Sequence, residues 1–297
     1  MLACALACAF PLSSHANPSG PQVLSGSASF STQGNTLTVR NSAGAILNWQ
    51  QFSIGAGEIT RFVQPSAASS VLNRVVGQNP SQILGQLSSN GRVFLINPNG
   101  IVFGAGARVD TAGLVASSLS LSDQDFLAGR LRFAGADGAG AVRNFGRIEA
   151  AGGPLLLIAP EVENHGLIVN SGGEVVLAAG SRVEVADPHE PNLRVAIESG
   201  GSAVNLGQVL APGGAIGMYG ALARQDGVLS ADGAERNAAG RIVLRASREA
   251  RVGGNSRTSA RGGAEAGGGS VSVTAAQVEV GAGAQIDVSG GSGGGQI

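Results

Sequence analysis

The chain has 297 residues and a formal net charge of −1, so it is long enough for a substantial core and has no excess of either charge. This balance gives no support for a nucleic-acid partner or an acidic membrane surface. Glycine accounts for 48 residues and aromatic residues for only 4% of the chain. Any core must therefore be built from small aliphatic side chains that recur along the sequence.

The first sixteen residues form an apolar run that ends in a small residue, Ala16. The run from Leu2 to Leu12 is shorter than the roughly 20 residues that span a bilayer. We therefore expect residues 1–16 to be a cleaved secretory signal and the chain to have no integral membrane segment. No basic residue precedes Arg40, which departs from the usual start of such signals and is compatible with a start codon upstream.

Both cysteines of the chain, Cys4 and Cys8, lie within this expected signal. The mature chain would then have no disulfide, no thiolate metal ligand and no cysteine nucleophile. It would be held together by packing and backbone hydrogen bonds alone.

Residues 17–27 form a Pro/Ser/Gly-rich leader, and short β-type runs alternate with turn residues from Ala28 onward. No long stretch shows the i, i+3, i+4, i+7 spacing of an amphipathic helix. Two segments are the best helix candidates. Ser69–Val76 is equally compatible with a strand, and Pro80–Leu87 has proline at a helix-start position that is compatible with one or two turns.

The second half of the chain contains an internal repeat. Asn144-Phe-Gly-Arg-Ile recurs 20 residues later at Asn164, and again 41 residues further on at Asn205, close to twice the first step. An aliphatic run follows at a similar phase in residues 154–160, 174–180 and 215–221. Two later runs, residues 241–246 and 270–275, are more widely spaced, and their Gly/Ala-rich loops account for the difference.

A period near 20 with short strands predicts an all-β fold, a right-handed parallel β-helix built as a single-stranded solenoid. Each coil would rise by about 4.8 Å, with aliphatic side chains stacked inside and Gly or Asn at the corners. Asparagines in register are expected to bond to one another along the stack. A β-sandwich is the alternative, but the two-residue Asn-Gly hairpin loops that it favours are scarce.

A β-helix has open ends that expose sheet edges, so its first coil needs a cap. Residues 28 to about 60 are the candidates, because the bulky side chains of Phe30, Trp49 and Phe52 can close a core of small residues. Ser120–Phe133 interrupts the coil pattern with four charges and two phenylalanines, and we expect it to pack beside the helix as a small extra-helical excursion, in the form of a hairpin.

The most distinctive part of the chain is the 59-residue block from Ile46 to Gly104. It contains Asn-Trp-Gln-Gln-Phe at 48–52, Val-Leu-Asn-Arg-Val at 71–75, and Val-Phe-Leu-Ile-Asn-Pro-Asn-Gly-Ile at 93–101. Asn-Pro-Asn-Gly indicates a turn, because proline presets φ near −65° and glycine or asparagine accepts the next corner.

In this order and spacing, with Asp110–Leu119 behind them, these stretches resemble the N-terminal two-partner-secretion (TPS) domain of TpsA exoproteins, the filamentous haemagglutinin and high-molecular-weight adhesin family. The resemblance covers roughly residues 25–135. A simpler interpretation of Asn-Pro-Asn-Gly is a structural corner, and the asparagines at 48 and 73 are equally compatible with inward amide bonds. The residues carried over as a transporter-recognition or folding motif are Asn48, Trp49, Phe52, Asn73, Arg74, Asn97, Pro98, Asn99, Gly100 and Ile101.

The resemblance implies a secretion and folding-nucleation domain with its cap in residues 28–140, followed by β-helix repeats in residues 141–297 that continue beyond the last residue. It implies export through the periplasm, where the POTRA domains of an outer-membrane, Omp85-type TpsB transporter recognise the unfolded chain. Folding then follows at the cell surface, and the first coils template the rest. A host-cell or glycan receptor would be bound by downstream regions, and the domain itself would be a monomer without a cofactor.

The alternative function is a secreted β-helical carbohydrate-active enzyme, a polysaccharide lyase or hydrolase, since fold alone does not decide activity. Glycoside hydrolysis usually needs two converging carboxylates. The pairs Asp123/Asp125 and Glu161/Glu163 have strand spacing that puts both carboxylates on one side, although a solvated face is the simpler interpretation.

Neither a metal site nor a cofactor site is expected. His165 and His189 are 24 residues apart, about one coil, and lack the spacing of a helix-borne zinc pair. We find no phosphate-binding, dinucleotide or nucleophile-elbow motif. The chain is therefore expected to be a non-enzymatic surface protein.

Overall fold

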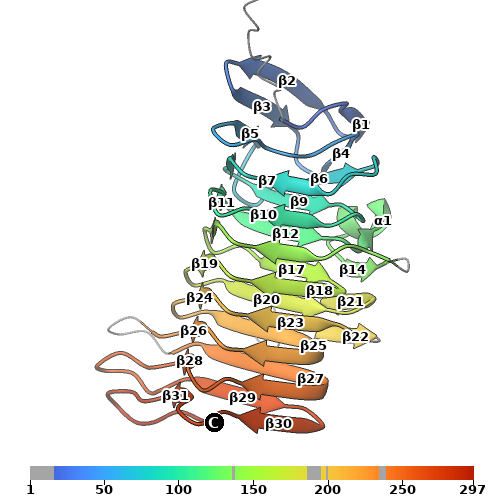
Figure 1. The fold of residues 1–297 in the computed structure, drawn as a ribbon. Coiled ribbons are helices and arrows are strands. Elements are labelled where there is room, and N and C mark those ends of the chain that lie inside the picture. Colours follow the sequence, from blue (N-terminus) through green and yellow to red (C-terminus); the bar gives the residue numbers. More distant parts are fainter. Residues whose placement is uncertain (1–16, 136–137, 186–194, 199, 234–238) are drawn as a thin grey trace, which may run out of the picture.

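The computed structural model describes residues 17–135, 138–185, 195–198, 200–233 and 239–297, and it shows a parallel β-helix that rises coil by coil from the N-terminal end (Figure 1). Strands from successive coils pair in parallel and form three stacks, two of which share one sheet. The predicted fold class is confirmed. The excursion and a cap are both present.

From the coil that begins at Ser70 onward, each coil contributes a strand to each stack, and two long strands each serve in two stacks. The first stack contains β4 (Ala45–Trp49), β6 (Ser70–Val75), β9 (Arg92–Ile96), β12 (Gly113–Ser117), β17 (Leu155–Ala159), β20 (Glu174–Ala179), β25 (Ala215–Gln225), β27 (Arg241–Val252) and β29 (Ser270–Thr274). The second contains β7 (Ser81–Ile83), β10 (Ile101–Phe103), β15 (Val142–Asn144), β18 (Glu161–Asn164), β23 (Ser202–Asn205) and β30 (Gln277–Val280). The third contains β3 (Thr36–Asn41), β5 (Ile59–Val63), β8 (Gln86–Ser89), β11 (Arg108–Thr111), β16 (Arg147–Ala150), β19 (Leu167–Asn170), β24 (Gln208–Leu210), β26 (Val228–Ser230), β28 (Arg257–Ser259) and β31 (Gln285–Asp287).

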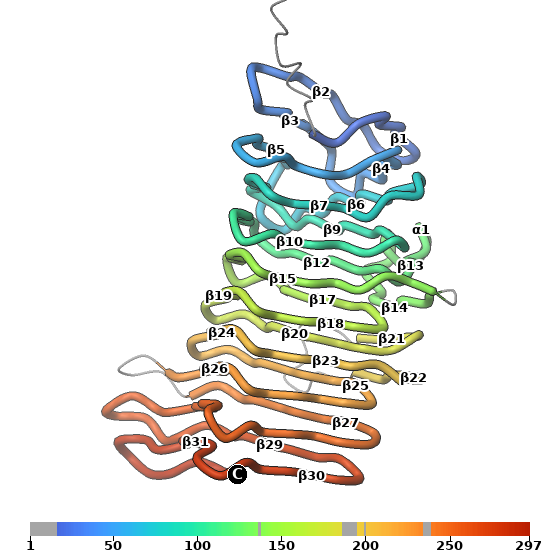
Figure 2. The backbone as a smooth tube through the Cα atoms, in the orientation of Figure 1, coloured from blue at the N-terminus to red at the C-terminus, as the bar shows by residue number. Residues whose placement is uncertain are grey.

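The long strands β25 and β27 pass from the first stack into the second without a break, because each pairs with strands of both. The tube in Figure 2 shows that the later coils also carry wider loops on one side. These are the Gly/Ala-rich segments, so the strands stay in register while the loops take up the extra length, as predicted. The equivalent residues Leu155, Val175, Ile216, Ile242 and Val271 stack on one another.

The interior is a continuous ladder of aliphatic side chains, closed by aromatic residues near the N-terminal end. In β17, Leu155 and Leu157 point into this core, whereas Leu156 and Ile158 point outward and are nevertheless buried. Burial on both faces explains why this strand is a continuous apolar run instead of an alternating one.

A four-stranded antiparallel sheet covers the outward face of the first stack. The predicted excursion provides β13 (Ser120–Leu121), helix α1 (Asp123–Leu127) and β14 (Leu131–Ala134). The helix was not predicted, although Ser122 accepts a hydrogen bond from the Asp125 amide as its N-cap. We call the four-stranded antiparallel sheet the cover sheet. Its other strands are β21 (Arg182–Val185) and β22 (Val195–Glu198).

The second insertion corrects our interpretation of the repeat. Asn164 and Asn205 are paired directly in β18 and β23, so their 41-residue separation is one coil and not two. The additional length is the β21–β22 hairpin, inserted between β20 and β23. The 20-residue step from Asn144 to Asn164 is a plain coil.

The predicted asparagine ladder is present and fully buried. Asn144 donates to Asn164 at 2.8 Å, Asn164 to Asn205 at 2.8 Å, and Asn205 to the side chain of Gln225 at 2.7 Å. Each amide thus satisfies its neighbour in the next coil, which removes the cost of burying it.

A column of glycines follows the same corner. A Cβ atom on Gly166 would overlap the carbonyl oxygen of Gly146, and one on Gly207 would overlap that of Gly166. Only glycine lets consecutive coils approach this closely at the corner.

The N-terminal cap is formed by antiparallel strands. β1 (Gln22–Ser25) pairs with β4, and β2 (Ala28–Gln33) forms a hairpin with β3. The predicted cap aromatics occupy this end, and the cap also includes β1, which lies in the leader. The expected signal, residues 1–16, is outside the described residues.

Both helix candidates are strands. Ser69–Val76 contains β6, and Pro80–Leu87 contains β7 and the start of β8. Pairing of Ser81 with Ile101 in β10 outweighs the local helix signal of the preceding proline. Among the described residues, no helix is long and apolar enough to cross a membrane.

Candidate functional site

The Asn-Trp-Gln-Gln-Phe stretch builds the aromatic end of the core. Trp49 ends β4 and makes edge-to-face contacts with Phe30 and Phe52, each at 5.6 Å between ring centroids. Phe52 in turn stacks on Phe62 at 6.4 Å. Trp49, Phe52 and Phe62 are almost completely buried, whereas Phe30 is 36% exposed at the rim. These rings close the interior of the first coil.

Asn73 supplies the polar partner that the buried indole requires. Its Oδ1 accepts a hydrogen bond from Trp49 Nε1 at 3.0 Å, and its Nδ2 donates to the Phe94 carbonyl at 3.2 Å. Asn73 is fully buried, so it connects three consecutive coils from within. A buried indole N–H without such an acceptor would destabilise the fold.

The next residue, Arg74, points outward and joins the second coil to the cover sheet. Its guanidinium donates to the Leu121 carbonyl at 3.0 Å and to Asp123 at 2.6 Å. Asn48, in contrast, is half-buried and its Oδ1 has no hydrogen-bond partner among the described atoms.

Asn-Pro-Asn-Gly forms the corner between β9 and β10, as the turn prediction required. Asn97 is fully buried and its Nδ2 donates to the Asn79 carbonyl and the Ser81 hydroxyl, both at 3.0 Å. Its Oδ1 accepts from the backbone amide of Asn99 at 3.0 Å. One buried side chain, that of Asn97, therefore fixes this corner from the inside.

The end of the turn depends on glycine. Gly100 has φ +104°, and a Cβ there would lie 2.9 Å from the Ala141 carbonyl oxygen. The following Ile101 is fully buried in the core at the start of β10. Both residues therefore set the entry into the next strand.

The structure brings the motif residues together at one corner column. The Val76 amide donates to the Trp49 carbonyl at 2.9 Å, and Asn99 Nδ2 donates to the Gly77 carbonyl at 2.9 Å. The corners after β4, β6 and β9 thus lie on one another in successive coils. Arg74 is the exception, because its head group points toward the cover sheet. Within the corner at 97–100, only Pro98 and Asn99 are exposed.

The two acidic pairs considered for catalysis are each engaged with arginines. Asp123 binds Arg74, and Asp125 binds Arg130 at 2.7 Å. The hydrogen bonds from Arg130 and then Ser122 hold the pKa of Asp125 below its usual range. A glycosidase acid needs a raised pKa, so this direction is opposite to that requirement.

The second pair, Glu161 and Glu163, shares one partner. Arg143 lies 3.2 Å from Glu161 and 3.4 Å from Glu163. Such half-exposed pairs are typical of a solvated face.

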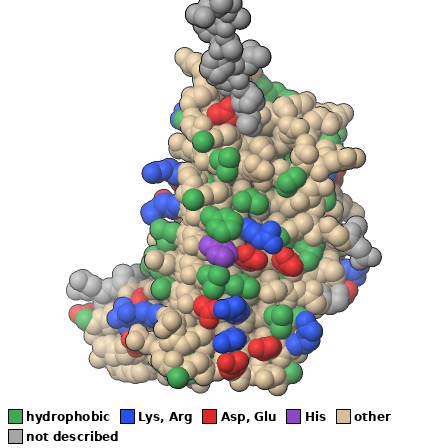
Figure 3. All heavy atoms as spheres, viewed as in Figure 1, with side chains coloured by type: hydrophobic (Ala, Val, Ile, Leu, Met, Phe, Trp, Pro, Cys, Tyr) green, Lys and Arg blue, Asp and Glu red, His purple; other side chains and the backbone are tan. Residues whose placement is uncertain are grey.

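His165 is also part of this surface. It lies 3.0 Å from Glu163 and stacks on Phe145 of the preceding coil at 4.7 Å between ring centroids. In Figure 3 the histidine lies between green apolar side chains, with charged ones beside it. No cluster of three metal-ligating side chains occurs among the described residues, and His189 lies outside them.

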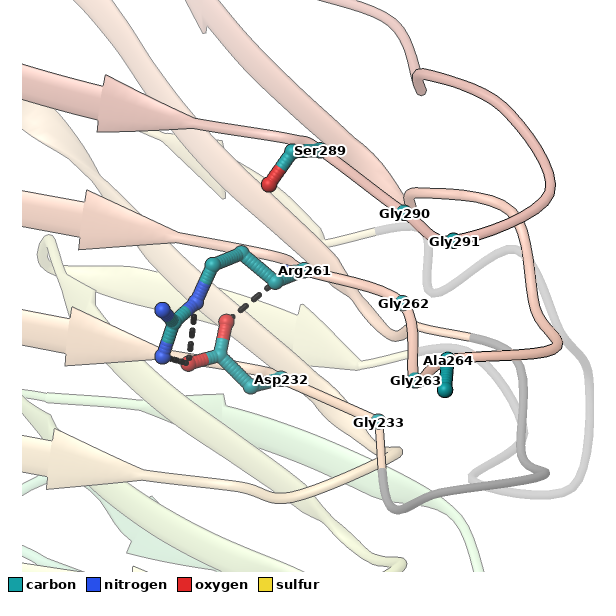
Figure 4. Close-up of a pocket in the computed structure, with 9 residues that line it drawn as sticks. All are labelled: Asp232, Gly233, Arg261, Gly262, Gly263, Ala264, Ser289, Gly290 and Gly291. Atoms are coloured by element: carbon teal, nitrogen blue, oxygen red, sulfur yellow. Dashed lines mark hydrogen bonds and ion pairs between the residues drawn. The ribbon is translucent and has the colours of Figure 1, made fainter.

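A depression of about 340 Å³ lies between the glycine-rich loops of the later coils (Figure 4). Its charged groups are Asp232 and Arg261, which are joined by three hydrogen bonds. Burial opposes ionisation of Asp232, but the bonds from Arg261 outweigh it and lower the pKa of Asp232. The pair stabilises neighbouring coils and leaves no reactive group.

Two titratable groups among the described residues have a strongly raised pKa. Burial raises the pKa of Glu174, at the start of β20, to about 7, with Arg241 opposing the shift. The nearby Tyr219 is buried under the cover sheet, which raises its pKa to about 12.

Sequence reasoning missed the second insertion and with it half of the cover sheet. Part of its signal was present, because residues 182–185 alternate polar with apolar residues and precede a proline-containing segment. It also missed Asn79 and Ser81, which bind Asn97 from the preceding coil. Nothing in their local sequence marks them.

The sequence matches a known protein family, and the fold matches that of a solved structure. A family model described as the TPS secretion domain matches residues 14–261. The crystal structure of the HMW1 secretion domain from Haemophilus influenzae superposes with a TM-score of 0.87 and 37% identity, covering 92% of this chain and 74% of that chain.

Two curated heme/hemopexin-binding proteins are also similar. One, from Haemophilus influenzae strain ATCC 51907 / DSM 11121 / KW20 / Rd, is 42% identical over 105 residues, which is 35% of this chain. The other, from Haemophilus influenzae, is 38% identical over 91 residues, which is 30% of this chain. The matched segments span only 12% and 10% of those relatives.

Proposed function

Because the chain belongs to the TPS secretion-domain family, we propose that it is the segment by which an outer-membrane TpsB transporter recognises and exports a larger exoprotein. Proteins of this family are exported and have a TpsB-type partner. The recognition motif in this proposal is the corner column that contains Trp49, Asn73 and Asn97, with its neighbouring motif residues.

The observation that carries the proposal is the burial of this motif. Trp49, Phe52, Asn73, Asn97 and Ile101 are at most 1% exposed in the folded domain. A partner that recognises these side chains must therefore bind them before the chain folds. This supports recognition of the unfolded segment by the periplasmic POTRA domains of the transporter.

Folding would then withdraw the motif from the transporter and drive release. Once outside, the aromatic cap and the first coils present paired strand edges on which later coils add. We infer that the domain is a monomer at the cell surface or in the medium, and that it nucleates the helix without catalysing a reaction.

Ligand binding is assigned to regions beyond this domain. The names of the curated relatives describe binding of heme or hemopexin, but the matched segments are about a tenth of those proteins. We propose that a host-cell, glycan or protein ligand of this exoprotein is likewise bound downstream. No geometry among the described residues favours the polysaccharide-cleaving alternative.

A release assay tests the proposal. The chain is expressed with a proven signal peptide, with and without the TpsB transporter encoded nearest to it. Folded protein should reach the medium only with the transporter. Transporter-independent release would contradict the proposal.

The motif is tested with matched variants in the same assay. Asn97→Ala and Trp49→Ala should reduce release strongly, whereas Phe145→Ala, at an exposed site, should not. Unfolded peptide 46–101 should compete for the purified periplasmic domains, and the folded domain should not. Truncation after residue 140 and after residue 261 compares the boundary expected from sequence with the end of the family match.

A further inference from the structure

The two edges of the cover sheet are protected to very different degrees. At one edge, β13 is only two residues long, Arg74 binds its Leu121 carbonyl, and α1 follows directly. At the other edge, β22 pairs with β21 and with no further strand among the described residues. Open strand edges accept further strands unless something blocks them.

A groove of about 440 Å³ runs beside the open edge. Its floor is largely apolar and already desolvated, since Tyr219 is 5% and Ala246 is 6% exposed. The groove is lined by Val195, Ala196, Ile197, Tyr219, Gly220, Arg245, Ala246, Ser247, Thr274 and Ala275.

The position of the groove matches that of one more strand. β22 packs on the first stack at β20 and β25, and β27 is the next strand of that stack. Strands of a sheet and successive coils have the same spacing of about 4.8 Å. A fifth strand beside β22 would therefore lie above β27 and cover its outward side chains.

Arg245 determines what such a strand must carry. In β27, Leu244 points into the core, so its neighbour Arg245 points outward into the groove. Its guanidinium has no hydrogen bond or ion pair within the described part of the chain. An all-apolar strand would bury this charge without a partner, whereas a strand with an inward carboxylate would pair with it.

We propose that the β22 edge is a docking site for an extended peptide of a partner protein, which adds as a fifth strand and places an acidic side chain over Arg245. Backbone hydrogen bonds supply affinity in this mode of recognition, and the side chains that face the floor supply specificity. The surface is separate from the buried motif proposed for the transporter and is available only in the folded domain.

The test uses the secreted chain and two labelled heptapeptides, Thr-Val-Thr-Asp-Thr-Val-Thr and the same peptide with Lys in place of Asp. The Asp peptide should bind about tenfold more tightly than the Lys peptide. The variant Arg245→Glu should reverse this order. Arg251→Glu, on the same strand and away from the groove, should retain it.

The site is located by amide hydrogen exchange. Binding of the Asp peptide should slow exchange in residues 195–198, and N-methylation of alternate peptide amides should abolish binding. Equal affinities for the two peptides, no binding of either, or protection elsewhere in the chain would each overturn the proposal.

Discussion

The first coils and the later coils of this β-helix are stabilised in different ways. In residues 17–117 the decisive contacts occur once each, such as Trp49 with Asn73 and Asn97 with Ser81. From residue 142 onward the contacts repeat from coil to coil, as in the asparagine ladder and the glycine column. Contacts that occur once define where a helix begins, whereas contacts that repeat allow it to be lengthened.

The largest effect is expected where a unique contact is removed. Trp49→Ala deletes the largest buried ring and leaves Asn73 without its donor, so the free energy of unfolding should fall by about 3–5 kcal/mol. Urea unfolding followed by circular dichroism measures this, since the variant has no tryptophan. Phe145→Ala, at a 41% exposed ring, should change it by about 0.5 kcal/mol. Equal effects would remove the distinction between the two regions.

A repeated contact should cost somewhat less. Gly166→Ala places a methyl group against the Gly146 carbonyl, so the coils must separate locally, at a cost of about 2–3 kcal/mol. Gly294→Ala meets open space and should be neutral within about 0.5 kcal/mol. Thermal unfolding of both variants provides the comparison, and a neutral Gly166→Ala would show that coil spacing is adjustable.

Interrupting the ladder should have a similar or smaller effect. Asn164→Ala leaves the Asn144 donor and the Asn205 acceptor buried without partners, and should lower the free energy of unfolding by about 2 kcal/mol. Glu161→Ala, on the same strand but exposed, serves as the control in the same urea titration. If both variants unfold at the same urea concentration, the ladder contributes no stability.

The smallest expected effect depends on pH. The folded-state pKa of Glu174 is raised to about 7, so between its ordinary value and pH 7 the folded chain binds more protons than the unfolded chain. Stability should therefore fall as pH rises through this window. Glu174→Gln should stabilise the domain at pH 8 by about 1–2 kcal/mol, because remaining solvent contact reduces the full value of the shift.

At pH 5 the Glu174→Gln variant should match the parent chain. The measurement is urea unfolding of both proteins at the two pH values. A pH-independent difference between them would show that Glu174 stays charged in the fold.

The sequence predicted the β-helix because ladder residues recur, so Asn144 and Asn164 identify a coil without any structural information. It predicted the Asn-Pro-Asn-Gly turn for the local reason that proline and glycine restrict the backbone. It did not predict the bonds from Asn97 to Asn79 and Ser81, since these depend on which coil stacks on which.

The length of a coil was also ambiguous in the sequence. The 41-residue step between Asn164 and Asn205 fitted two plain coils as well as one coil with an insertion. Only the direct pairing of β18 with β23 distinguishes the two possibilities. The inserted strands β21 and β22 bury their apolar side chains against outward-facing residues of the first stack, which a plain coil would leave in water.

The cover sheet joins segments that are far apart in the chain, since Arg132 of β14 binds Glu184 of β21, 52 residues later. A chain that emerges and folds from its N-terminus can cover the first coils with the first insertion, since Phe126 of α1 packs on Phe94 at 5.1 Å between ring centroids, but β14 then lacks its partner strand β21. This edge of β14 stays open until the second insertion has emerged. The cover sheet is therefore incomplete for part of the folding process, and a chain that stalls at this stage would be an intermediate prone to aggregation.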